Sequence, residues 1–209
     1  MSRRNSILIF TLVLAICVIS HRLLRPITAR AQGANDPAVT EKTDRDDAIA
    51  MAAFESIVPV LHHPRCMNCH SSGDFPRQGD DSHRHTMNVR RGLEGQGVTG
   101  LKCSTCHQDH NLAGEHMPPG APDWHLPSAR EPMIWEGLND RQLCELFKNP
   151  SQNGHRTTEE IVQHMSSPLV LWAWHPGEGR SPVPVNENQF LAKVKEWASH
   201  GAACPANSR

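Results

Sequence analysis

The spacing of apolar and polar residues predicts helices towards both ends of the chain. Thr43 is a candidate N-cap followed by aspartates, and apolar residues then recur at helical spacing until Pro59, which we expect to end the helix. Another amphipathic helix is predicted between Asn186 and Gly201. The apolar stripes consist of Ala50, Ala53, Phe54, Ile57 and Val58 in the first helix and of Phe190, Leu191, Val194, Trp197 and Ala198 in the last.

Capping residues predict two shorter helices between these. Asn139 with Gln142 at position N3 has the spacing of a capping box and opens a helix that ends before a proline. Thr157 with Glu160 opens a second one, which runs through Met165. The apolar run over 169–174 leaves its type open, and we interpret its tryptophans as buried packing residues rather than as the lining of a pocket.

The segment from 71 to 127 is dense in glycine, proline, aspartate and histidine and shows no clear periodicity. Such a composition favours irregular loops over helices and long strands. The predicted fold class is therefore mainly α with extensive irregular loops. After a polar, disordered leader over 32–42, residues 43–205 have the length of a single domain.

The first 31 residues have the three parts of a secretory signal peptide. Arg3 and Arg4 precede an apolar run over 7–19, and Ala29-Arg30-Ala31 matches a cleavage site. The run is short for a membrane span, so we expect cleavage after Ala31 and export to the periplasm through the Sec pathway. The alternative is an uncleaved segment that anchors the protein to the inner membrane.

Removal of this segment leaves an acidic protein. The chain has 21 basic and 22 acidic residues, and five arginines but no acidic residue lie within 1–31, which leaves a formal net charge of about −6. No basic stripe remains that could neutralise a phosphate backbone, so we exclude nucleic acid as a partner. Contact with a membrane is expected only through the N-terminal segment, if that segment is uncleaved.

The pattern C-x-x-C-H occurs twice, from Cys66 to His70 and from Cys103 to His107. It is the attachment signature of c-type haem, in which two thiols bond the vinyl groups of the porphyrin and the next imidazole binds the iron. We therefore predict two covalently attached haem c groups. The predicted attachment residues are Cys66, Cys69, Cys103 and Cys106, and the predicted proximal iron ligands are His70 and His107.

The alternative for the same four cysteines is a four-thiolate zinc site or a redox dithiol. Zinc requires no histidine after either pair of cysteines. With 14 histidines among 209 residues, the chance that both pairs are followed by one is below about 1%. Export from the cytoplasm also agrees with haem attachment, so we favour haem.

The composition predicts that the haems contribute to the fold as well as to function. Aromatic residues make up 5% of the chain, tyrosine is absent, and there are 16 prolines and 14 glycines. Such a chain has little apolar material of its own for a core, and two buried porphyrins would supply it. We therefore expect a single dihaem domain with a haem-bearing half over 43–127 and a helical buttress over 128–205.

Two cysteines of the exported chain remain outside the motifs. Cys17 lies in the signal segment, which leaves Cys144 and Cys204 as an even pair in an oxidising compartment. We predict that they form a disulfide worth about 3 to 4 kcal/mol, with two free buried thiols as the alternative.

The ligand on the second face of each iron determines whether the protein only transfers electrons or can also bind and convert a substrate. A second protein ligand closes the iron, whereas an open position permits a substrate to bind. Histidine is abundant outside the motifs, which favours bis-histidine coordination. We predict His85 and His125 as the distal iron ligands. Their rivals by position in the chain are His83, Met87, His116 and Met117.

Further sequence blocks accompany the two motifs. They are His63-Pro64-Arg65-Cys66, Gly79-Asp80-Asp81, Arg90-Arg91-Gly92, the stretch over 118–126, Asn153-Gly154 with Arg156-Thr157, and Gly201-Ala202-Ala203-Cys204-Pro205. In these blocks the chain resembles, from Leu61 to Cys204, a family of small exported dihaem cytochromes c that are labelled as subunits of isoquinoline 1-oxidoreductase, a molybdenum hydroxylase. The resemblance implies that the chain accepts electrons from a periplasmic molybdenum hydroxylase. It does not make the chain the hydroxylase, because the length for a molybdopterin domain is lacking.

These features predict a periplasmic electron-transfer protein rather than an enzyme. It would relay single electrons from a dehydrogenase or molybdenum hydroxylase to an acceptor of the respiratory chain. The alternative is a dihaem peroxidase-like enzyme with one open haem site, against which the surplus of histidine argues. The sequence has no paired carboxylates, nucleophile elbow or dinucleotide fingerprint to support a reaction outside the haems.

Overall fold

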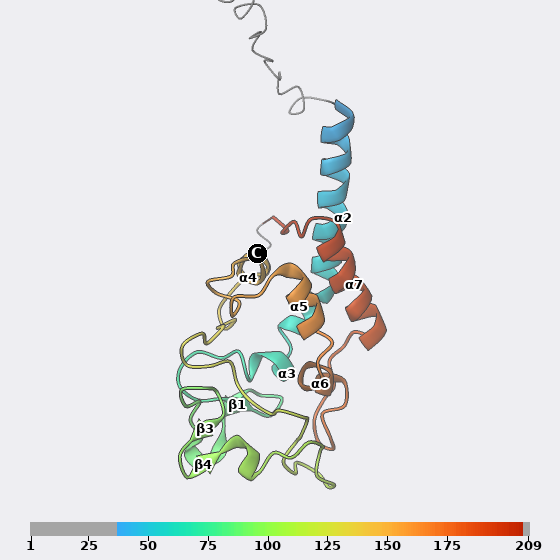
Figure 1. Cartoon of the computed structure of the whole chain (residues 1–209). Helices are drawn as coiled ribbons and strands as arrows, with labels where there is room; N and C mark the ends of the chain where they lie inside the picture. The colour runs from blue at the N-terminus through green and yellow to red at the C-terminus, as the bar shows by residue number, and fades with distance from the viewer. Residues whose placement is uncertain (1–36, 207–209) are drawn as a thin grey trace, which may run out of the picture. The chain divides into compact units, whose positions relative to one another are not determined.

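A computed structural model describes residues 37–206 of the chain. These residues form six α-helices joined by long loops, with only short strands, so the mainly α class is confirmed (Figure 1). The predicted signal peptide over 1–31 and residues 32–36 of the predicted leader lie outside the described residues. Among the described residues, no helix has both the length and the apolar character that a membrane span requires.

Helices lie towards both ends of the described chain, and two short hairpins lie between them. The helices are α2 (Pro37–Leu61), α3 (Pro64–Met67), α4 (Asp140–Lys148), α5 (Thr158–His164), α6 (Pro168–Leu171) and α7 (Glu187–Ser199). The strands are β1 (Arg77–Gln78), β2 (His83–Arg84), β3 (Gly97–Val98) and β4 (Leu101–Lys102). The 3₁₀ helices are η1 (Thr86–Asn88), η2 (Cys103–Thr105) and η3 (Trp172–Trp174). Helix α6 and η3 thus occupy the apolar run whose type the sequence left open.

Helix α2 departs from the prediction at both ends. It begins at Pro37 rather than near Thr43, because the Ala, Glu and Lys between 38 and 42 favour a helix; these residues were expected in the disordered leader. It also continues through Pro59, although a proline inside a helix costs about 3 kcal/mol. Val60 and Leu61 follow the proline and are each 1% exposed. Burying each of them contributes about 1.5 to 3 kcal/mol, which outweighs the local cost.

The predicted capping boxes are present in the structure. The side chain of Asn139 accepts a hydrogen bond from the backbone N–H of Gln142 at 2.9 Å at the start of α4. The side chain of Thr157 accepts one from the backbone N–H of Glu160 at 3.2 Å at the start of α5. Asn186 caps α7, as predicted. These three helices therefore begin where the local sequence fixes them.

One apolar core among the described residues joins α2 to the helices of the C-terminal half. The ring of Phe54 in α2 lies 6.0 Å from that of Phe147 in α4 and 5.6 Å from that of Trp197 in α7, measured between centroids. Cys144 and Cys204, the pair predicted from the sequence, form a disulfide that ties α4 to the segment after α7. Helix α2 thus shares its core with the predicted buttress over 128–205, whereas we expected it to belong to the haem-bearing half over 43–127.

Residues 71–127 are mostly irregular, as predicted, and contain two antiparallel hairpins that the sequence did not indicate. Strand β1 pairs with β2, and β3 pairs with β4. The buried guanidinium of Arg91 holds the loops together, since Nη1 donates to the carbonyl of Pro127 at 2.7 Å and Nη2 to that of Ser71 at 3.2 Å. At Gly95, φ is 77° and an added Cβ would lie 1.9 Å from the carbonyl oxygen of Leu126. Only glycine permits this close approach of two backbone segments.

Candidate functional site

The first C-x-x-C-H motif begins in α3, and a helical turn brings its chemical groups together. His63 caps the helix, since its Nδ1 accepts a hydrogen bond from the backbone N–H of Arg65 at 3.3 Å. The backbone N–H groups of Cys69 and His70 donate to the carbonyl oxygen of Cys66 at 3.2 and 3.1 Å. Residues at i, i+3 and i+4 share one face of such a turn, so the two thiols and the imidazole lie on the same side.

The second motif makes the same turn in a different setting. It begins in η2, and the backbone N–H groups of Cys106 and His107 donate to the carbonyl oxygen of Cys103 at 3.2 and 3.0 Å. The three side chains again share one face. The two motifs adopt the same backbone turn because they have the same spacing of cysteine and histidine. The hydrogen bonds of this turn lie within the motif itself.

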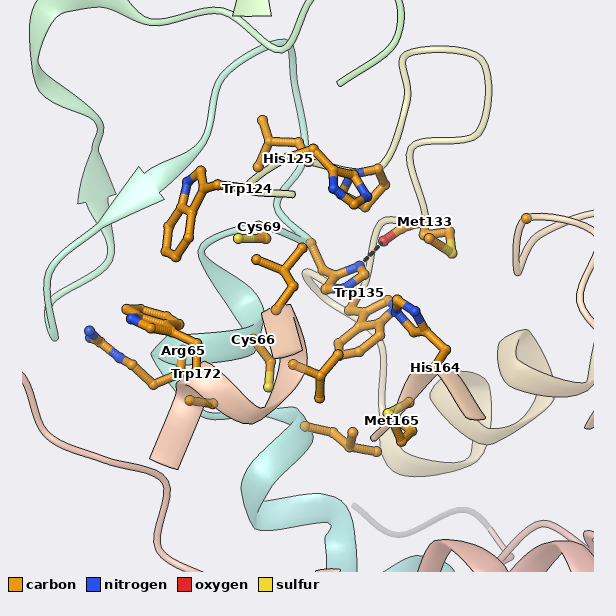
Figure 2. A pocket seen from close by; sticks show the side chains of 18 of the residues that line it. Arg65, Cys66, Cys69, Trp124, His125, Met133, Trp135, His164, Met165 and Trp172 are labelled. Atoms are coloured by element: carbon orange, nitrogen blue, oxygen red, sulfur yellow. Dashed lines mark hydrogen bonds between the residues drawn. The ribbon is translucent and has the colours of Figure 1, made fainter. Parts of the chain in front are cut away.

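Each motif lies on the wall of its own cavity. The first cavity, of about 310 Å³, is lined by Cys66, Cys69 and His70, and Figure 2 shows it from close by. The second, of about 650 Å³, is lined by the two cysteines and the histidine of the second motif. Both volumes lie in the range of ligand pockets, and all four cysteines are free thiols. Within residues 37–206, no group of three or more His, Cys, Asp or Glu side chains converges as a metal site.

The two motif histidines are oriented by equivalent hydrogen bonds. Nδ1 of His70 donates to the carbonyl oxygen of Met133 at 2.9 Å, and Nδ1 of His107 donates to that of Pro119 at 2.7 Å. A carbonyl can only accept, so the proton is on Nδ1 in both rings. Nε2 is therefore the nitrogen whose lone pair remains for a metal, and the second-shell carbonyl fixes its direction.

A tryptophan ring stacks on each motif histidine. Trp135 lies 3.6 Å from His70 at an interplanar angle of 5°, and Trp124 lies 4.6 Å from His107 at 6°. Each imidazole is thus held both by a hydrogen bond at one edge and by an aromatic face. The sequence did not indicate either contact, because both tryptophans are distant in the chain from the histidine they cover.

The second cavity places a further histidine opposite its motif. The ring of His85 lies 6.1 Å from that of His107, and Nδ1 of His85 donates to the carbonyl oxygen of Thr86 at 2.8 Å. Two imidazoles that share one metal ion at bonds of about 2 Å have centroids roughly 6 Å apart. The separation of the two rings is therefore the one that two imidazole ligands of a single metal ion would have. The rivals His83, Met87 and His116 line the same cavity, whereas Met117 is not among its lining residues.

The first cavity contains two further histidines (Figure 2). His125 was predicted, and its Nδ1 donates to the carbonyl oxygen of Asp123 at 2.5 Å. His164, at the end of α5, was not singled out by the sequence analysis. Within residues 37–206 its ring has no hydrogen-bond partner. Only its position in a predicted amphipathic helix could have drawn attention to it, because nothing in the sequence links that helix to His70.

Burial sets the protonation of these groups. It raises the pKa of the Cys66 thiol to about 12 and that of Cys69 to about 11. Burial lowers the pKa of His70 to about 3, although the bond to Met133 opposes the shift, and it lowers the pKa of His164 to about 4. Both imidazoles are therefore neutral at physiological pH, which is the form that binds a metal.

The two cavities share part of their walls. The shared residues are Arg65, Cys69, Trp124, Leu126 and Trp172. The indoles of Trp124 and Trp172 meet edge to face at 4.9 Å and 85°. Trp172 is therefore a lining residue of both cavities, which corrects our interpretation of this tryptophan as a packing residue only.

Comparisons of the chain with protein families, with curated proteins and with solved structures found no match.

Proposed function

We propose that the protein is a periplasmic dihaem c-type cytochrome that relays single electrons. The observation that carries this proposal is the repetition of one arrangement: each C-x-x-C-H motif lines a cavity, and its histidine is fixed in the same way by a backbone carbonyl and a stacked tryptophan. In each motif Cys and His share the face of one turn. A structural zinc site would require neither the histidines nor two separate cavities.

The residues present fit covalently attached haem. Cys66, Cys69, Cys103 and Cys106 would hold it, and the Nε2 atoms of His70 and His107 would bind the iron. Haem bound there would supply a one-electron couple of ferric and ferrous iron. The protein's own contribution is to fix the histidines, exclude water from the buried motif groups and place aromatic side chains between the two cavities.

His85 supports a closed second site, because its ring lies 6.1 Å from that of His107, a separation that suits two ligands of one metal ion. Bis-histidine coordination leaves no position for a substrate, so this site favours electron transfer. At the first site, His125 and His164 are the histidines available for the same role.

The expected donor is a periplasmic dehydrogenase or molybdenum hydroxylase, and the expected acceptor belongs to the respiratory chain. The molybdenum hydroxylase is implied by the resemblance of the sequence blocks around the motifs. The surplus of acidic over basic residues outside 1–31 indicates a partner surface with basic residues. Electron exchange with the partner should therefore slow as ionic strength rises.

The first experiment is expression in a bacterial host that attaches haem c, followed by intact-mass analysis. The purified chain should gain the mass of two haems, the pair Cys66→Ala and Cys69→Ala should lose one, and the pair Cys103→Ala and Cys106→Ala the other. The matched control Cys144→Ala with Cys204→Ala should retain both. A chain that binds zinc and carries no covalent haem under these conditions would contradict the proposal.

A second candidate is a dihaem peroxidase-like enzyme with one open iron. It is favoured by an asymmetry: within residues 37–206, His107 has a facing imidazole in His85, whereas the stacked ring of His70 has no imidazole at a matching separation. Carbon monoxide added to the dithionite-reduced protein distinguishes the two functions. Unchanged low-spin bands indicate two closed irons and an electron carrier, and a shifted Soret band indicates an open site.

A further inference from the structure

Arg65 lies between the two cavities and lines both of them. Its side chain is only 1% exposed, and its guanidinium carbon lies 5.9 Å from the ring centroid of Trp172, which also lines both cavities (Figure 2). A charge in this place acts on the two cavities through protein rather than through water, so its field is weakly screened.

The guanidinium of Arg65 is only partly neutralised by its neighbours. Nη2 donates to the carbonyl oxygen of Gly79 at 2.9 Å and pairs with the carboxylate of Asp80, whose side chain is 45% exposed. Solvent screens that carboxylate more than it screens the buried guanidinium. The carboxylate of Asp80 therefore offsets the positive charge of Arg65 only in part.

The Nε–H group of Arg65 has no acceptor among the described residues. Nε is buried and has no hydrogen-bond partner within residues 37–206. Leaving such a donor unpaired costs about 1 to 3 kcal/mol, so buried donors of this kind are nearly always satisfied. No acceptor at Nε therefore offsets the positive charge of the guanidinium.

We infer that Arg65 raises the reduction potentials of both haem irons together, by holding one buried positive charge beside both cavities. The inference rests on the proposed function. Reduction lowers the charge of an iron centre by one, so a fixed positive charge close to it favours the reduced state. Because the same side chain lines both cavities, its removal changes two potentials rather than one.

The test is a potentiometric titration of the purified holoprotein and its variants, followed at the reduced α-bands. In Arg65→Gln both midpoint potentials should fall, and Arg65→Lys, which keeps the charge, should restore most of the loss. Arg141→Gln is the matched control, because it removes the same charge from the exposed surface of α4 and should change neither potential by a comparable amount.

Asp80→Asn provides a second variant whose expected shift has the opposite sign. Removing the carboxylate leaves Arg65 less compensated, so both potentials should rise, whereas general loosening of the fold would move the two variants in the same direction. A shift at one haem only, shifts of the same sign in both variants, or no shift in either overturns the inference. Absence of covalent haem from the wild-type protein is a different result, and it refutes the proposed function itself.

Discussion

Loss of the disulfide between Cys144 and Cys204 should remove a large share of the stability of this protein. Cys144 lies in α4 and is fully buried, and Cys204 lies in the segment that follows α7. The bridge therefore joins the segment after α7 to a helix that packs in the core. Replacing both cysteines with alanine opens this loop.

The magnitude follows from the length of chain that the bridge closes. The two cysteines are 60 residues apart in the sequence. On the chain-entropy model, a crosslink of this span destabilises the unfolded state by about 4 kcal/mol at 25 °C. Domains of this kind have unfolding free energies of about 5 to 15 kcal/mol, so the double variant should fold but be markedly less stable.

Urea unfolding of the holoprotein, followed by circular dichroism, measures this effect. With a slope of about 2 kcal/mol per M, a loss of about 4 kcal/mol lowers the midpoint by roughly 2 M. Cys144→Ala and Cys204→Ala alone should each lose as much as the double variant, because either change breaks the same bond. If the three variants lose the same unfolding free energy, the loss comes from the crosslink and not from the packing of either side chain.

A loss below about 1 kcal/mol would refute this reasoning. It would mean that non-covalent contacts already restrain the C-terminal segment. Two such contacts are present: Nε1 of Trp197 donates to the carbonyl oxygen of Ala203 at 3.2 Å, and the backbone N–H of Ala202 donates to that of Trp197 at 2.9 Å. The chain-entropy value would then overstate the freedom that the bridge removes.

Three further predictions concern single side chains. His85→Ala should make one haem high-spin and able to bind carbon monoxide, because His85 faces His107; an unchanged low-spin spectrum excludes it as a ligand. Hydrogen bonds from Ser72 hold the pKa of Glu136 below its ordinary value of 4.5, so its contribution to stability is present above pH 4.5 and is lost as the pH falls through the lowered pKa. In urea titrations Glu136→Gln should therefore be less stable than wild type at pH 7, with a gap that narrows below pH 4.5; a gap independent of pH contradicts this. Asn139→Ala should lower the unfolding free energy by about 1 kcal/mol, measured in urea, and no loss would mean that the capping box is dispensable.

The end of α2 was predicted wrongly because the burial of residues after Pro59 outweighs the helix-breaking effect of this proline. The sequence predicted that α2 ends at Pro59, because a proline breaks a helix when no tertiary contacts oppose it. In the protein, Val60 and Leu61 continue the apolar face of the helix into the core, and their burial outweighs the lost backbone hydrogen bond. No single stretch of sequence contains the partner surface that decides this balance.

The sequence by itself determined the features that depend on near neighbours. These are the capped starts of three helices, the turn that aligns the thiols and imidazole of each motif, and, by elimination among seven cysteines, the disulfide pair. Each rests on covalent spacing or on hydrogen bonds within one turn, which the order of residues fixes directly.

Only the tertiary structure decided what surrounds the two motifs. His70 meets Met133 across 63 positions of the chain, Trp135 stacks on His70, and Arg65 lines both cavities. Such contacts form when long loops close, and the loops close because the core and the buried Arg91 hold their ends. The distance between two residues in the sequence does not show which distant segments come together when the loops close.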